Sequence, residues 1–127
     1  MNRIFLLVAA VLLMNTAIAQ DNPEDYEQIL PEAAQKCVMP RSPDSIPDDA
    51  LYEDLVNAKK QIAEFQGKIE EYRQCLSAAE SNEDNTPGNN AAIVASYNYT
   101  VETEERVAER FNAAVRSFKE RKAAAEG

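Results

Sequence analysis

The fold is decided by residues 51–79, LYEDLVNAKKQIAEFQGKIEEYRQCLSAA, where apolar residues recur at alternating steps of four and three. This spacing is the heptad repeat of a helix that packs along a partner helix. The sequence therefore predicts a long amphipathic helix over residues 48–81, with Asp48 or Asp49 as its N-terminal cap. The apolar positions that define its packing face are Leu51, Leu55, Ala58, Ile62, Phe65, Ile69, Tyr72, Leu76 and Ala79.

A second helix is expected after one short loop. Residues 82–90 are mostly turn formers, which favours a loop. The heptad spacing then resumes and predicts a helix over residues 91–123, capped by Asn89 or Asn90, with a tail over residues 124–127. Because a short loop joins antiparallel neighbours, we expect an all-α fold, a long coiled-coil-like hairpin of two antiparallel helices. The second packing face would comprise Val94, Tyr97, Val101, Glu104, Ala108, Phe111, Val115 and Phe118.

The two predicted faces also indicate a register. Paired residues of an antiparallel hairpin have a nearly constant sum of residue numbers, and seven apolar pairs, Leu76 with Val94 among them, sum to 169 or 170. This agreement favours one specific pairing. Glu104 is the one polar residue in the second face. We interpret it as a polar layer that fixes the register, with Lys68 as its partner, and a functional carboxylate is the alternative.

The first 19 residues have the features of a cleaved export signal. Arg3 precedes an uncharged apolar run over residues 4–13, and Ala17-Ile18-Ala19 offers small residues to a signal peptidase. We therefore expect residues 1–19 to be removed and the mature chain to lie in the periplasm, with release from the cell as the alternative. No later apolar stretch reaches the about 20 residues that a membrane-spanning helix needs.

Residues 20–47 contain five of the six prolines and are expected to form an extended arm. An exported chain with two cysteines favours a disulfide, here between Cys37 in the arm and Cys75 in the first helix. The helix back from Cys75 to its start spans ~40 Å at 1.5 Å per residue. The arm from Cys37 to the same point reaches ~34 Å as a polyproline strand. The bridge therefore predicts an arm that lies nearly taut along the hairpin.

One flank of the second helix offers a surface for this arm. A spare apolar stripe lies beside the predicted packing face, on the same side of the hairpin as Cys75. We expect this stripe to form a groove that receives Val38, Met39 and Ile46 of the arm. A second copy of the chain is the rival occupant, so a monomer is preferred and a homodimer is the alternative. The candidate groove residues are Ile93, Thr100, Val107 and Ala114.

Composition excludes several classes of function. The chain has no His and three Gly, which removes imidazole acid-base catalysis, histidine metal ligands and glycine-rich phosphate loops. Its 22 acidic and 13 basic residues give a formal net charge of −9 at pH 7, which repels the phosphates of nucleic acids. We therefore expect no nucleic-acid partner, and we assign no catalytic, cofactor-binding or metal-binding residues.

Short motifs spread over the mature chain resemble a family of small exported proteobacterial proteins. They include Cys37-Val38-Met39-Pro40, Ile46-Pro47-Asp48, Tyr72-Arg73-Gln74-Cys75-Leu76, Tyr97-Asn98, Val107-Ala108-Glu109-Arg110-Phe111-Asn112 and Val115-Arg116-Ser117-Phe118. Members of that family have no assigned activity. The resemblance thus implies a periplasmic location and paired cysteines, and it implies no catalytic residues.

Three classes of function remain. The preferred one is a non-enzymatic interaction or structural protein, which presents its helical hairpin to an envelope protein as partner. The alternative is a chaperone-like binder of unfolded chains, which would need an exposed apolar concavity. An enzyme is the least favoured class, because a two-helix hairpin hardly encloses converging catalytic groups.

Overall fold

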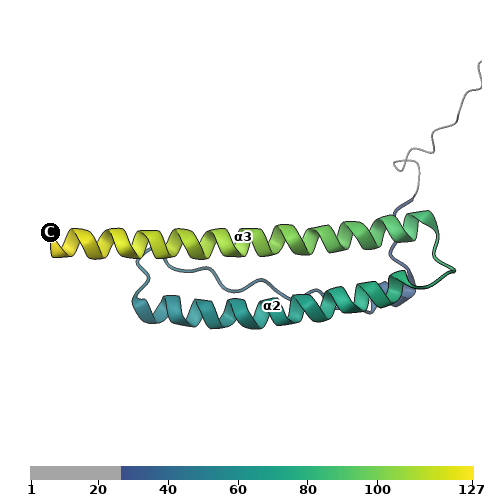
Figure 1. The fold of residues 1–127 in the computed structure, drawn as a ribbon, viewed down its shortest axis with the longest axis horizontal. Coiled ribbons are helices and arrows are strands. Elements are labelled where there is room, and N and C mark those ends of the chain that lie inside the picture. Colours follow the sequence, from purple (N-terminus) through teal and green to yellow (C-terminus); the bar gives the residue numbers. More distant parts are fainter. Residues whose placement is uncertain (1–26) are drawn as a thin grey trace, which may run out of the picture.

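The computed structural model describes residues 27–127, which form a helical hairpin with an N-terminal arm. The elements in chain order are α1 (Glu32–Gln35), α2 (Tyr52–Glu80) and α3 (Pro87–Glu126). Helices α2 and α3 lie side by side and antiparallel, and the arm runs along them from the loop end of the hairpin toward the start of α2 (Figure 1). The expected leader, residues 1–19, and the first part of the arm, residues 20–26, lie outside the described residues.

The described part of the chain is helical and contains no strand. None of its helices combines the length and the apolar character needed to cross a membrane. The all-α class expected from the heptad spacing is therefore confirmed for residues 27–127. A disulfide joins Cys37 to Cys75, with 5.7 Å between their Cα atoms, which confirms the predicted cysteine pair.

Helix α2 starts later than the sequence predicts. Residues 48–50 lie outside it, and Leu51 occupies the cap position, where its N–H donates to Asp54 Oδ2 at 2.8 Å. Asp48 and Asp49 therefore do not cap this helix. The segment before α2 forms a turn instead, in which the N–H of Ala50 donates to the carbonyl oxygen of Pro47 at 3.1 Å. Arg121 of α3 also donates to the carbonyl oxygens of Asp48 at 2.5 Å and Ala50 at 2.6 Å.

Helix α3 starts earlier and ends later than the predicted range of 91–123. Its cap is Thr86, whose Oγ1 accepts from the N–H of Asn89 at 3.1 Å, while Asn89 Oδ1 accepts from the N–H of Thr86 at 3.0 Å. Pro87 then occupies the first helical position, where its missing N–H costs nothing. Asn89 and Asn90 were thus wrongly predicted as caps, because the stronger Thr-Pro start signal lies inside the expected loop. The expected tail continues the helix to Glu126.

The packing face of α2 largely follows the predicted heptads. Seven of its nine positions are buried, while Ile62 is half-buried and Leu51 is 69% exposed. Leu51 lies outside the core because it is the cap residue rather than part of the helix. The buried positions are Leu55, Ala58, Phe65, Ile69, Tyr72, Leu76 and Ala79.

The predicted packing face of α3 is wrong over the part nearest the loop, whereas Phe111, Val115 and Phe118 of that face are half-buried. Val94, Tyr97 and Val101 are 49%, 45% and 39% exposed. Ile93 and Thr100, which directly precede Val94 and Val101 in the sequence, are buried instead. One residue corresponds to about 100° of rotation around a helix. The arm explains this rotation, since it adds apolar side chains on one side of the hairpin and α3 turns its spare stripe toward both α2 and the arm.

Two clusters of buried side chains form the core. Near the loop end, Ala34 of α1 packs with Tyr72, Leu76, Ala79 and Ile93. Further along the hairpin, Phe65 and Ile69 pack with Val107. Met39 of the arm packs against both clusters. The arm is therefore a third layer of the fold, placed where it closes one side of the space between the two long helices.

Candidate interaction surface

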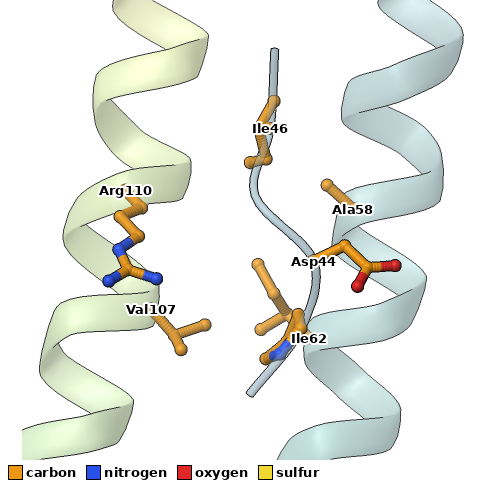
Figure 2. A pocket seen from close by; sticks show the side chains of 7 residues that line it. Asp44, Ile46, Ala58, Ile62, Val107 and Arg110 are labelled. Atoms are coloured by element: carbon orange, nitrogen blue, oxygen red, sulfur yellow. The ribbon is translucent and has the colours of Figure 1, made fainter.

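The spare stripe of α3 lies against the arm at three of its four positions. Ile93 belongs to the cluster that Met39 and Cys37 cover, and Val107 to the cluster that Met39 and Ile62 cover. Ala114 lines a hollow together with Ile46 and Pro47. Figure 2 shows the arm passing between the helices, and Ile46 of the arm lines one hollow together with Ala58 of α2 and Val107 of α3. The sequence predicts that Val38 also lies in this groove. That prediction is wrong, because Val38 is 82% exposed.

Thr100, the fourth stripe residue, makes polar contacts instead. It is fully buried, and its Oγ1 accepts a hydrogen bond from Arg73 Nε at 2.8 Å while donating to the carbonyl oxygen of Tyr97 at 2.6 Å. A buried hydroxyl with both functions satisfied costs little to desolvate. This threonine therefore connects the two long helices nearer the loop end of the hairpin than its open end.

Arg73 is the centre of the polar layer that crosses the interface. Its Nη2 lies 2.5 Å from Glu104 Oε2, and the two side chains are 17% and 28% exposed. Its guanidinium carbon also lies 5.1 Å from the ring centroid of Tyr97, a cation–π distance. Lys68 was thus wrongly predicted as the partner of Glu104. The rotation of α3 explains the difference, because it brings Glu104 alongside Arg73, and the heptad spacing carried no signal for that contact.

An apolar row on α3 has no covering element among the described residues. The α3 row consists of Val94, Tyr97, Val101 and Ala108, which the sequence assigned to the interhelical interface and the structure leaves exposed. A shallow hollow at the loop end connects the row to α2, and Leu76, Ser77, Glu80, Val94 and Tyr97 contribute to its walls. The row therefore continues into the space between the two helices on the side away from the arm.

The described residues contain no candidate metal-binding cluster. No group of three or more Cys, Asp or Glu residues within 27–127 could hold a metal ion. Every buried side-chain nitrogen and oxygen in this part of the chain has a hydrogen-bond partner, so none is left aimed at an absent ligand. The arrangement offers surfaces rather than an enclosed site.

Comparison of the chain with protein-family models, curated proteins and solved structures found no match.

Proposed function

We propose that this protein is a non-enzymatic interaction protein of the bacterial periplasm, which presents one face of its hairpin to an envelope protein. The observation that carries the proposal is the α3 row. Large apolar side chains at helical spacing are exposed on a protein that buries comparable side chains elsewhere. Contiguous exposed apolar surface of this kind marks interaction sites.

The rest of the hairpin supports this role by making the face rigid. The disulfide ties the arm to α2, the Arg73–Glu104 ion pair ties α2 to α3, and Arg121 ties the far end of α3 to the turn before α2. A rigid face loses little conformational entropy when a partner binds. The disulfide also suits an oxidising compartment, which together with the leader-like start supports export to the periplasm.

Photo-crosslinking in living cells tests the proposal. A photoreactive phenylalanine analogue replaces Tyr97 in the α3 row, and the matched control carries it at Ala95, which is exposed on another face of α3. We expect a discrete crosslinked protein band from position 97 in the periplasmic fraction and none from position 95. Equal bands from both positions, or none from either, would contradict a specific interaction face. Many bands of different size from position 97 would instead support the chaperone-like alternative.

A further inference from the structure

The α3 row carries an acidic flank. Glu102, Glu105 and Glu109 follow the same three- and four-residue spacing as the row and are exposed. None of the three forms an ion pair with another described residue, since the ion pairs within residues 27–127 are Glu32 with Lys36 and Arg73 with Glu104. Glu80 of α2 borders the hollow at the loop end of the row. The α3 row is therefore an apolar strip with carboxylates along its edges.

This strip lies on the side of α3 that the arm does not cover. Val101 and Val107 are six residues apart, which places their side chains about 120° apart around the helix. Val107 packs beneath the arm and Val101 is exposed. The row from Val94 to Ala108 extends ~21 Å along the helix at 1.5 Å per residue. This length matches four turns of a partner helix.

Resting on the proposed function, we infer that the partner docks a cationic amphipathic helix along the α3 row. Apolar residues of that helix at three- and four-residue spacing would cover Val94, Tyr97 and Val101. Lysine or arginine on its flanks would face the unpaired carboxylates of Glu102 and Glu105. Complementary charge of this kind steers the approach and sets the orientation of the docked helix.

Charge also decides against a second copy of this chain as the occupant. A two-fold antiparallel pairing through the row would set the glutamate flank of one copy against the same flank of the other, where like charges repel. Each copy also carries a formal charge of −9. Arg73, which lies over the ring of Tyr97 in the row, is already paired with Glu104.

Binding of a designed peptide tests the inference. The probe is a synthetic 21-residue helix with leucine at the heptad a and d positions and lysine at e and g, and its matched counterpart has glutamate at e and g. Fluorescence anisotropy measures binding to the oxidised protein. We expect saturable binding of the lysine peptide, weakened by added salt, and no binding of the glutamate peptide.

Two variants of equal charge separate docking from general attraction. Val101→Lys places a cation in the row, and Ala95→Lys places the same charge on another exposed face of α3. We expect Val101→Lys to weaken lysine-peptide binding by about tenfold or more and Ala95→Lys by less than about twofold, with both helical by circular dichroism.

Several outcomes would overturn the inference. They are equal weakening by both variants, tight binding of the glutamate peptide, and a dimer of the free protein that Val101→Lys dissociates in light scattering. Failure of the lysine peptide to bind would also end it. The position-97 crosslink in cells would still support the proposed function in that case, so the two failures are distinguishable.

Discussion

Arg73 of α2 and Thr100 of α3 are joined by a hydrogen bond of 2.8 Å that crosses the interface between the two long helices. A buried threonine at this position means that the interface is polar at a point toward the loop end of the hairpin. The register of the hairpin is therefore defined by a directional contact as well as by apolar layers. At the open end, the rings of Tyr52 and Phe118 lie 6.4 Å apart, whereas the heptad spacing pairs Phe118 with the preceding residue, Leu51.

The rotation of α3 predicts that two matched substitutions destabilise the protein to different extents. Val107→Ala removes buried methyl groups and should destabilise the protein by about 2 kcal/mol. Val101→Ala removes an exposed side chain and should change stability by less than about 0.5 kcal/mol. Urea unfolding of both variants measures the difference. A larger loss for Val101→Ala would favour the heptad interface expected from the sequence over the observed one.

The polar layer predicts coupling between Arg73 and Glu104. Removing either partner leaves the other charge partly buried, so Arg73→Ala and Glu104→Ala should each cost about 1–3 kcal/mol. Their double variant should cost less than the sum, with a coupling energy of about 1 kcal/mol that decreases in salt. Lys68→Ala is the control, because Lys68 was the partner expected from the sequence. Coupling of Glu104 to Lys68 instead of Arg73 would contradict the observed layer.

The start of α3 predicts a capping effect. Thr86→Ala removes the acceptor for the Asn89 N–H and should destabilise the protein by about 1 kcal/mol. Asn90→Ala, at a cap position that the sequence favoured, should be nearly neutral because Asn90 is exposed and inside the helix. Thermal unfolding of the two variants compares them. Equal destabilisation by both substitutions would contradict Thr86 as the cap and favour a helix that starts after Asn90, as the sequence predicted.

The disulfide predicts local release of the arm on reduction. The bridge closes a loop with a sequence separation of 38, for which the chain-entropy relation gives about 3–4 kcal/mol. After reduction, the amides of Ala34 and Cys37, which donate to Pro31 and Ala34 at 2.9 and 3.0 Å, should exchange faster. Amides around Ile69 should keep most of their protection, because they belong to α2.

Hydrogen exchange of the oxidised and reduced protein makes this comparison, and the double variant Cys37→Ser with Cys75→Ser should reproduce the reduced pattern. Unchanged exchange at Ala34 would show that packing alone holds the arm. Global loss of protection would show that the hairpin depends on the arm.

The sequence identifies the residues of the candidate surface but assigns them to the buried interface between the helices. Val94, Tyr97 and Val101 stand out by their spacing, which is what a helix interface and a docking face share. The sequence shows two apolar stripes on this helix and not which one the rest of the chain covers. The two stripes are about 100° apart, and either could have met α2.

Heptad spacing, one cluster of turn formers and a single pair of cysteines are enough to predict the helical hairpin and the disulfide, because they allow few alternatives. The rotation of α3 and the partner of Glu104 depend instead on contacts between elements. The arm, and Met39 in particular, adds a third packing surface that no single helix encodes. Helix α3 buries the face that packs against both α2 and the arm. The spacing of apolar residues within α3 does not show which face can make both contacts.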